Sequence, residues 1–402
     1  MAIAIVRRQV VTPSSAIVPQ LKNFFNQDIS YMRARIQGLT AMALSTKEKP
    51  AISSPPEYLL RSASKTNLSM VDTSGSSYQA AVCEELKKPL VMKDLSRQPL
   101  KNSEVRIKVE YCGINYADIL KSMGLYQERP ELPFVPGCEP AGTIIEVGRD
   151  VTGYQIGDRV IAPMHLGGYA DECVNYTKSV WKLPDNVSLQ DATAGLVSYG
   201  TAHMALIAKA GTQIGETVLV SGAAGSVGLA AVDIAANVIG AKVIAIVGDD
   251  EKIELAKDRG ATYVINHRKQ DVRKEILAIT NKRGVNVMID NVGGDMFKIG
   301  LRSIAMDGRI VPIGFASGQI PSIPANILLV KNVSVIGLFW SNYELFDHEK
   351  FSESVTTILQ LCSEKKIRPH YSKVFPYNKV NQAFKFILGR KSTGKVLLCP
   401  NH

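Results

Sequence analysis

The stretch VLVSGAAGSVGLAAVDIAANVIGAKVIAIVGDDEK, residues 218–252, decides the fold of this chain. An apolar run ends in a glycine-rich turn, a stretch of small residues follows, and a second apolar run comes next. In the middle stretch, one helical face carries Val227, Ala231, Ile234 and Val238. Further short apolar runs alternate with helical patterns as far as residue 337. This alternation predicts an α/β domain over residues 198–337, with a doubly wound parallel sheet covered on both faces.

The glycine-rich turn is typical of a dinucleotide-binding loop, because it follows a strand and opens a helix. Its first glycine is replaced by Ala223, while Gly225 lets the backbone approach a pyrophosphate and Gly228 lets the helix pack on the strand. The helix N-terminus then offers free N–H groups to the anion. The predicted phosphate-binding residues are Ala223, Ala224, Gly225, Ser226, Val227 and Gly228. No Gly-Lys-Ser or Gly-Lys-Thr follows, which argues against a nucleoside triphosphate site; the alternative is a glycine-rich turn in an ordinary α/β domain.

The end of the next strand distinguishes NADP from NAD. An NAD site usually carries an acidic residue there for the ribose 2′-hydroxyl. Here the strand ends at Gly248, which leaves space, while Lys252 and His267 could donate to a 2′-phosphate. Asp249 and Asp250 have two interpretations: they cap the following helix, or they point inward and repel a phosphate. We favour NADPH over NADH.

Composition excludes several functional classes. The chain has 402 residues, of which 46% are apolar and 21% charged, and its formal net charge is +10. No run of about 18 consecutive apolar residues occurs, so no membrane span is expected. Basic residues do not cluster with aromatic ones, which argues against nucleic acid as a partner. The six cysteines form no CxxC pair, which favours a reducing compartment over a disulfide framework.

Residues 1–77 differ in composition from the rest. They carry nine Lys and Arg residues against four Asp and Glu residues, and the first acid is Asp28. Such a basic, acid-poor start is typical of a mitochondrial transit peptide. Residues 45–77 are rich in Ser, Lys and Pro and are typical of a linker. We therefore expect a disordered transit peptide and linker and a mitochondrial protein; the alternative is an extension with no targeting role in a cytoplasmic protein.

The sequence pattern changes at Tyr78. Short apolar runs such as EVRIKVEYCGIN (104–115) and TIIEVG (143–148) are separated by Gly and Pro. This pattern predicts a compact all-β lobe over residues 78–197. A helical stretch and a closing strand follow residue 340.

Six stretches carry a resemblance to a known family: CGINYADILKSMGLY (112–126), LPFVPGCEPAGTIIEVG (132–148), GDRV (157–160), AAGSVG (223–228), DNVGG (290–294) and STGKVLL (392–398). With these motifs in order, residues 78–402 resemble the medium-chain dehydrogenase/reductase superfamily, and within it the zinc-free quinone oxidoreductase (zeta-crystallin-like) branch. The resemblance implies a GroES-like β-barrel catalytic lobe over residues 78–197 plus 338–402. It also implies that residues 198–337 form a Rossmann domain that binds NADP(H).

The resemblance allows a test for zinc. Zinc-dependent relatives use a Cys, a His and a further Cys or acid at the catalytic metal. The Cys position corresponds to Asn115 and the His position to Cys138, and no Cys lies near residues 194–198. Catalytic zinc requires three protein ligands, so we expect no metal. Cys138 is then expected to be a small buried residue, with a reactive thiol as the alternative.

The resemblance also implies site residues. Asn115 and Asp118 should lie beside the nicotinamide, although Asp118 could equally be a structural cap. Tyr126 could donate a proton or a hydrogen bond to a developing enolate, or it could only shape an apolar pocket. The remaining residues expected to line the cofactor are Thr201, Asn291, Gly293, Gly314, Phe339 and Arg390.

Three functions are consistent with these residues. The first is hydride transfer from NADPH to a quinone or related conjugated carbonyl without zinc. The second is reduction of an enoyl thioester or enone, with Tyr126 as proton donor. The third, from another class, is an NADPH-binding protein with little or no turnover. The family also implies a homodimer, in which the apolar edge strand of residues 333–340 pairs across a two-fold axis.

Overall fold

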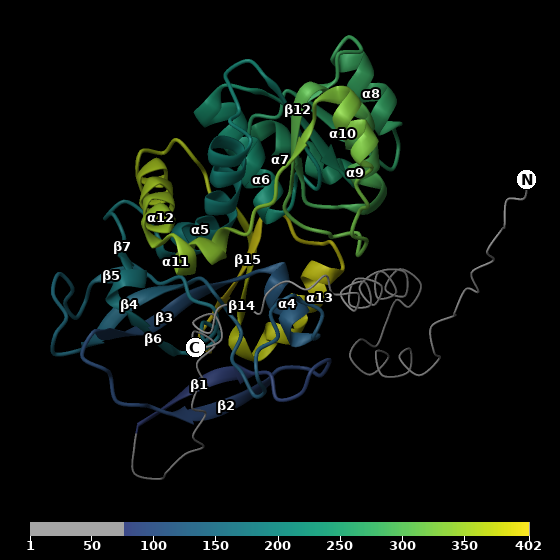
Figure 1. The fold of residues 1–402 in the computed structure, drawn as a ribbon. Helices are drawn as coiled ribbons and strands as arrows, with labels where there is room; N and C mark the ends of the chain where they lie inside the picture. The colour runs from purple at the N-terminus through teal and green to yellow at the C-terminus, as the bar shows by residue number, and fades with distance from the viewer. Residues whose placement is uncertain (1–75, 402) are drawn as a thin grey trace, which may run out of the picture.

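The computed structural model describes residues 76–401. The predicted transit peptide and almost all of the linker lie outside the described residues. Within the described part of the chain, no helix is long and apolar enough to cross a membrane. Figure 1 shows two lobes, one built around a parallel sheet and the other from the first and last parts of the described chain.

The first lobe is built on a seven-stranded sheet in the order β14-β15-β3-β4-β5-β7, with β6 also paired to β3. Its strands are β3 (Glu104–Ile114), β4 (Pro140–Val147), β5 (Arg159–Ile161), β6 (Glu172–Tyr176), β7 (Trp181–Lys182), β14 (Tyr371–Pro376) and β15 (Lys395–Cys399). A separate hairpin contains β1 (Ser77–Val82) and β2 (Val91–Ser96), paired antiparallel. Strand β15 pairs antiparallel with β3, so the end of the chain completes the lobe that its first strands began.

The expectation that residues 78–197 are all β is wrong. These residues also contain α4 (Tyr116–Ser122), η1 (Thr177–Ser179) and the first part of α5 (Leu189–His203). The remaining helices of this lobe are η5 (Trp340–Asn342), α11 (Tyr343–Phe346), α12 (His348–Ser363), η6 (Tyr377–Lys379) and α13 (Val380–Leu388), and α12 confirms the helical stretch expected after residue 340. Helix α4 has only seven residues. That is two turns, too short for a helical period to show in the sequence.

The second lobe contains a six-stranded sheet in the order β10-β9-β8-β11-β12-β13. The strands are β8 (Thr217–Val220), β9 (Lys242–Val247), β10 (Tyr263–Asn266), β11 (Val285–Asp290), β12 (Ile304–Pro312) and β13 (Ser334–Val335). Every pair in it is parallel. Numbered within the lobe, the order is 3-2-1-4-5-6, that of a doubly wound dinucleotide-binding fold. The predicted fold is confirmed, and its crossover point lies between β8 and β11.

Helices cover both faces of this sheet (Figure 1). They are η2 (Met204–Lys209), α6 (Ser226–Asp233), η3 (Ile234–Ile239), η4 (Asp250–Lys252), α7 (Ile253–Asp258), α8 (Val272–Ile279), α9 (Gly294–Ser303) and α10 (Ala325–Lys331). Strand β8 shows why its sequence is apolar throughout: Val218 and Val220 belong to one buried cluster, whereas Leu219 belongs to another. Since alternate side chains point to opposite faces, a strand buried on both faces needs an apolar residue at every position.

The predicted helical face from Val227 to Val238 is divided between two elements. The α-helix α6 ends at Asp233, and residues 234–239 continue as the π-helix η3. Gly240 then adopts a left-handed φ of 78° and ends the helical segment.

The expected edge strand of residues 333–340 is also shorter, because β13 contains only Ser334 and Val335. One more ladder bond joins the Ile336 N–H to Ile310. The chain then leaves the sheet and buries Trp340, which is 3% exposed and packs against Phe351 at a centroid distance of 4.7 Å. Burial of this large indole in the other lobe ends the strand.

We propose to keep the division into residues 78–197 plus 338–402 and residues 198–337, because it follows membership of the two sheets. Helix α5 crosses the first boundary. A second connection is direct: the Gly394 N–H donates to the Ala224 carbonyl at 2.8 Å. This bond joins the start of β15 to the glycine-rich loop, so the two lobes meet at the predicted site.

Candidate active site

The glycine-rich loop lies at the carboxyl end of β8, beside the crossover point of the parallel sheet. Gly222, one position before the expected motif, takes the left-handed φ of 60° that the tight turn needs. Ala223 is fully buried. The substitution of Ala for the motif's first glycine is therefore tolerated, because Gly222 makes the turn.

Helix α6 presents its N-terminus at this loop. Gly225 is the N-cap and is exposed, and within the described residues no side chain caps the helix. The backbone N–H groups of Ser226 and Val227 are thus first-turn donors with no intrahelical partner. An N-terminus of this kind is a suitable site for an anion such as a pyrophosphate.

Replacing Gly228 by Ala is expected to lower the free energy of unfolding by about 1–3 kcal/mol. The added methyl would lie 2.2 Å from the Gly222 carbonyl oxygen and 2.9 Å from the Ala223 Cα. Both neighbours are backbone, so the helix must move away from the strand. Gly337→Ala is the matched control, because an added methyl there meets nothing within 4 Å. Urea denaturation of both variants measures the difference, and equal losses would contradict the close packing argued here.

The loop after β11 joins the same site through a carboxylate that sequence reasoning missed. Asp290 is fully buried and accepts hydrogen bonds from the Ser221 hydroxyl and from the N–H groups of Val292 and Gly293. Burial raises the pKa of this carboxyl. Asn291 in turn donates through its side chain to the Ser221 carbonyl at 2.8 Å. Asp290 thus connects the loop after β8 to the loop after β11, on the two sides of the crossover point.

Gly293 and Gly314 lie in this second loop system. Gly293 has a φ of 70°, and an added Cβ would lie 2.7 Å from the Gln319 carbonyl oxygen. At Gly314 the nearest atom to an added Cβ is the Asn291 carbonyl oxygen, at 3.5 Å. The structure therefore brings together Asn291, Gly293 and Gly314, three of the residues expected to line the cofactor.

Four cationic or polar side chains surround the end of β9. An added Cβ on Gly248 would lie 3.3 Å from His267 Nε2. Lys252 Nζ donates to the backbone carbonyl of Arg390 at 2.9 Å, and the Arg390 guanidinium is close enough to His267 to lower the pKa of its imidazole. Arg268, which sequence reasoning missed, forms an ion pair with Asp249. Three cations and one imidazole thus gather where a ribose 2′-substituent is bound in this fold.

The interpretation of Asp249 and Asp250 as helix caps is wrong. Asp249 makes no side-chain cap and instead pairs with Lys252 at 3.1 Å and with Arg268. Asp250 accepts from the Asn266 amide and pairs with Lys269. Lys252 in the same turn, and Arg268 and Lys269 after β10, offer these carboxylates stronger partners than a backbone N–H.

The charges of this cluster shift two pKa values. Burial raises the pKa of Asp249, but Lys252 and Arg268 together lower it by more, so Asp249 is ionised at neutral pH. Burial first, and then Arg268 and Arg390, lower the pKa of His267. His267 is therefore neutral at pH 7 and offers one N–H and one lone pair.

On the other lobe, Asn115 lies in a buried polar network. Its amide donates to Glu139 Oε1 at 2.6 Å and to Cys138 Sγ at 3.3 Å, and its Oδ1 accepts from Lys395 Nζ at 2.9 Å. Lys395 and Glu139 form an ion pair at 2.5 Å, with both side chains 0% exposed. The Val197 N–H also donates to Glu139, which ties the network to helix α5.

Asp118 lies beneath this network and is 1% exposed. It accepts from the Asn115 N–H at 2.9 Å, which caps helix α4, and from the Tyr169 hydroxyl at 2.8 Å. Both contacts hold the entry of α4 in place. Of the two roles that the sequence allows, we therefore propose the structural one for Asp118: it positions Asn115.

Tyr126 lies where the two lobes meet. Its ring packs edge-on against Phe339 of the chain returning from the parallel-sheet lobe, at a centroid distance of 6.3 Å. Lys121 Nζ, which is ion-paired with Glu128, lies 5.5 Å from the ring centroid. Burial first, and Glu128 second, raise the pKa of the Tyr126 hydroxyl. Tyr126 therefore keeps its proton at neutral pH and can donate a hydrogen bond.

Thr201 belongs to helix α5 and is 9% exposed. It lies one helical turn after Val197, which contacts Glu139. Thr201 thus lies on α5 at the boundary between the lobes, one turn beyond the Asn115 network.

Comparison with known proteins places this geometry in a family. An alcohol dehydrogenase GroES-like domain matches residues 101–227, and a zinc-binding dehydrogenase domain matches residues 226–360. Bovine quinone oxidoreductase-like protein 2 is 49% identical over 324 residues, which cover 81% of this chain and 93% of the bovine protein. The chain belongs to the medium-chain dehydrogenase/reductase family.

Solved structures of this family share the fold. A quinone oxidoreductase of Escherichia coli, complexed with NADPH, is 27% identical with a TM-score of 0.72, over 81% of this chain and 99% of that one. The CurK enoyl reductase is 26% identical with a TM-score of 0.73, over the same shares of the two chains. A quinone oxidoreductase and an enoyl reductase are therefore both structural neighbours of this protein.

One of the two matched domains is described as a zinc-binding dehydrogenase. In this chain, however, the side chains at the expected metal position bind the ammonium group of Lys395. Among residues 76–401, no group of three or more His, Cys, Asp and Glu side chains is arranged to hold a metal ion. At the position expected for the family's metal, Asn115 and Glu139 are both bound to the ammonium of Lys395. Cys138 has its pKa raised, by burial first and then by Asp118. It is thus a neutral thiol, and its sulfur accepts a hydrogen bond from the Asn115 amide.

Proposed function

We propose that this protein is a zinc-independent oxidoreductase that transfers a hydride from NADPH to a quinone or a related conjugated carbonyl. The observation that supports it most strongly is the gathering of Lys252, Arg268, Arg390 and His267 at the end of β9, on the fold of a quinone oxidoreductase family. Titration with NADPH and NADH, followed by addition of quinones, tests it: NADPH should bind more tightly and be oxidised.

The residues present fit the cofactor. The glycine-rich loop leaves no space for a side chain at Gly228, so the helix N-terminus approaches the strand closely. Its free N–H groups suit a pyrophosphate. The loop of Asn291, Gly293 and Gly314 lies across the crossover point, where dinucleotides bind in this fold. The E. coli neighbour is complexed with NADPH, which supports the same ligand here.

The proposed preference for NADPH rests on charge. A 2′-phosphate would compete with the Asp249 carboxylate for Lys252 and Arg268, and it offers more acceptor oxygens and more charge. Asp249 pairs with both cations, so the carboxylate is turned toward them and not available as a lone acceptor for ribose hydroxyls.

When bound, the reduced nicotinamide supplies a hydride to an electron-poor acceptor. The chain's part is to orient the acceptor and stabilise the charge that develops on its oxygen. Lys395 and Glu139 fix the Asn115 amide in one orientation. Tyr126 offers its hydroxyl as a hydrogen-bond donor beside Phe339. Positioned donors of this kind act without reorganisation during the reaction.

Tyr126→Phe separates the two enzymatic functions. Because the pKa of Tyr126 is raised, we expect a hydrogen bond to the acceptor and no proton release. Quinone reduction should fall by no more than about tenfold, the value of one hydrogen bond. If Tyr126 were a general acid for an enoyl thioester, kcat would fall by about 10²–10⁴-fold. Steady-state kinetics with a quinone and an enoyl thioester distinguishes these results; Tyr263→Phe, on the exposed face of β10, is the control.

Two further functions remain testable by the same assays. The CurK neighbour supports reduction of enoyl thioesters as the second enzymatic candidate. A protein that binds NADPH without turnover is the candidate from another class; tight NADPH binding without oxidation by any acceptor would identify it.

Zinc independence is tested by dialysis of the protein against a chelator. The activity measured after dialysis should remain unchanged.

We also propose a homodimer and a mitochondrial location. Helix α10, beside the edge strand β13, exposes Leu329 by 77% and Val330 by 66%. Apolar side chains at a sheet edge favour a covering partner. Sedimentation at several concentrations tests the dimer, and a monomer at all of them would contradict it.

The proposed mitochondrial location rests on the composition of residues 1–77 alone, and imaging of the full chain in cells tests it.

A further inference from the structure

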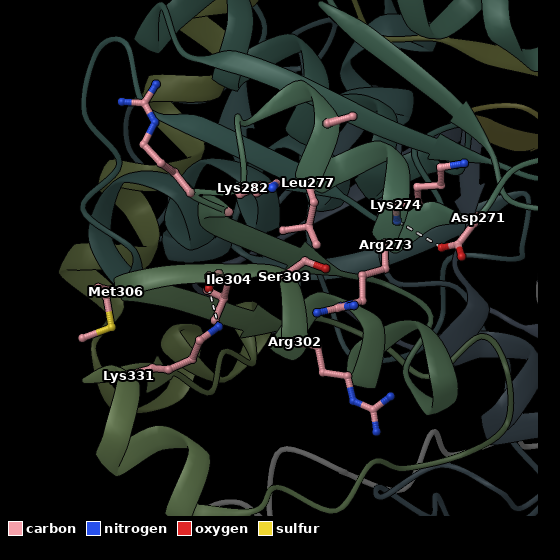
Figure 2. Close-up of a pocket in the computed structure, with 13 residues that line it drawn as sticks. Asp271, Arg273, Lys274, Leu277, Lys282, Arg302, Ser303, Ile304, Met306 and Lys331 are labelled. Atoms are coloured by element: carbon pink, nitrogen blue, oxygen red, sulfur yellow. Dashed lines mark hydrogen bonds between the residues drawn. The ribbon is translucent and has the colours of Figure 1, made fainter.

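A cavity of about 800 Å³ lies in the parallel-sheet lobe, at the amino ends of β11 and β12, and Figure 2 shows the residues that line it. Lys282 and Arg283 line it just before β11 begins, and Ile304 lines it at the start of β12. The glycine-rich loop instead follows the carboxyl end of β8. The cavity and the candidate active site are therefore separated by the length of the strands. Its volume is within the range of small-molecule sites, about 300–1,000 Å³.

The cavity is strongly cationic. Its positively charged lining residues are Arg273, Lys274, Lys282, Arg283, Arg302 and Lys331. The one carboxylate of the lining, Asp271, already accepts from the Lys274 N–H as the N-cap of α8. Within residues 76–401, the structure gives no ion pair to any of the six cations, whereas Lys298 and Arg309 nearby in the chain are paired with acids. The lining thus has five positive charges in excess.

Helix dipoles account for only part of this charge. Arg302 lies in the last turn of α9 and Lys331 in that of α10, where cations are favoured. Lys331 Nζ also donates to the Ile304 carbonyl at 2.6 Å. Arg273 and Lys274, however, lie in the first turn of α8, where the dipole disfavours a cation. The helix dipole therefore does not account for these two cations.

The cations also repel one another. Figure 2 shows Arg273, Arg302 and Lys331 arranged around Ser303 and Ile304. Burial first, and Arg273 second, lower the pKa of Lys331. A bound anion would reverse that effect and relieve the repulsion.

We propose that this cavity binds a small organic polyphosphate. The guanidinium groups of Arg273, Arg283 and Arg302 suit phosphate oxygens, which they can pair in a bidentate manner. Leu277 and Met306 give an apolar wall for the rest of the ligand. None of the 13 lining residues is aromatic, so the stacking surface that single-stranded nucleic acid uses is missing from this cavity.

Calorimetric titration of the full chain with inorganic tripolyphosphate tests the proposal. We expect saturable binding at one site per chain, unchanged by prior saturation with NADPH. Arg273→Gln combined with Arg302→Gln should weaken it by about a hundredfold, tenfold for each lost charged contact. Both side chains are exposed, and circular dichroism checks that the variant folds.

The control removes the same charge elsewhere. Lys257 and Lys366 are 55% and 59% exposed and lie outside the cavity; Lys257→Gln with Lys366→Gln should change the affinity by less than about threefold. Equal weakening in the two variants, competition by NADPH, or absence of saturable binding would overturn the proposal. Tighter binding of a single-stranded oligouridylate than of tripolyphosphate would overturn it in favour of a nucleic-acid surface.

Discussion

Lys395→Met is expected to cost about 3–5 kcal/mol of the free energy of unfolding, because it leaves the buried Glu139 carboxylate without its cation. Both partners are 0% exposed and lie 2.5 Å apart. The Asn115 amide and the Val197 N–H would still donate to Glu139, but neither carries a charge. Chemical denaturation measures the loss.

The variant should also acquire a pH dependence. Burial already raises the pKa of Glu139, and Lys395 opposes the rise; without Lys395 the folded-state pKa lies further above that of the unfolded chain. A raised folded pKa means that the folded state holds the proton more tightly, so stability falls as pH rises. The loss should be larger at pH 8 than at pH 5.

Two variants control this prediction. Glu139→Gln combined with Lys395→Met removes both charges and should restore most of the stability. Lys298→Met breaks an exposed pair with Asp295 and should cost less than about 1 kcal/mol. A loss for Lys395→Met no larger than that of Lys298→Met would contradict the account of the buried network.

Arg268→Ala combined with Lys252→Ala is expected to weaken NADPH binding by about a hundredfold or more, since each charged contact contributes about 1.5–3 kcal/mol. NADH binding should stay constant or improve, because Asp249 loses both of its cationic partners and can accept from ribose hydroxyls. Fluorescence titration of the variant with each cofactor measures the change.

Lys269→Ala is the matched control, because Lys269 pairs with Asp250 next to the cluster. It should leave the ratio of the two affinities unchanged. Equal weakening of NADPH and NADH in the double variant would show that these cations do not contact the 2′-position.

The fold was predictable from the sequence because burial on both faces makes the central strands β8 and β9 almost entirely apolar. In β8, Val218 and Val220 pack in one hydrophobic cluster and Leu219 packs in another. The strand therefore appears in the sequence as an unbroken apolar run. The glycine positions were predictable for a similar reason: Gly228 has no room for a side chain. The exact turn was not, since Gly222 makes it one position earlier than the motif suggests.

The polar networks could not be predicted. Asn115 and Lys395 are 280 positions apart, and no spacing rule connects them, because they meet only where β15 pairs with the end of β3. Arg268 follows the third strand, and only the parallel order places it beside Asp249. The sequence motif "DNVGG" pointed to the loop of Asp290, but the hydrogen bond from Ser221 to Asp290 forms only because β8 and β11 are neighbours in the sheet.

The most direct test of the central proposal is a single turnover. The full chain, saturated with NADPH, is mixed with an excess of a quinone, and the absorbance of the reduced nicotinamide is followed; an enoyl thioester is tested in parallel. The account predicts stoichiometric oxidation of NADPH by the quinone, with slower or no oxidation by the thioester. Tight binding of NADPH with no oxidation by either acceptor would contradict it.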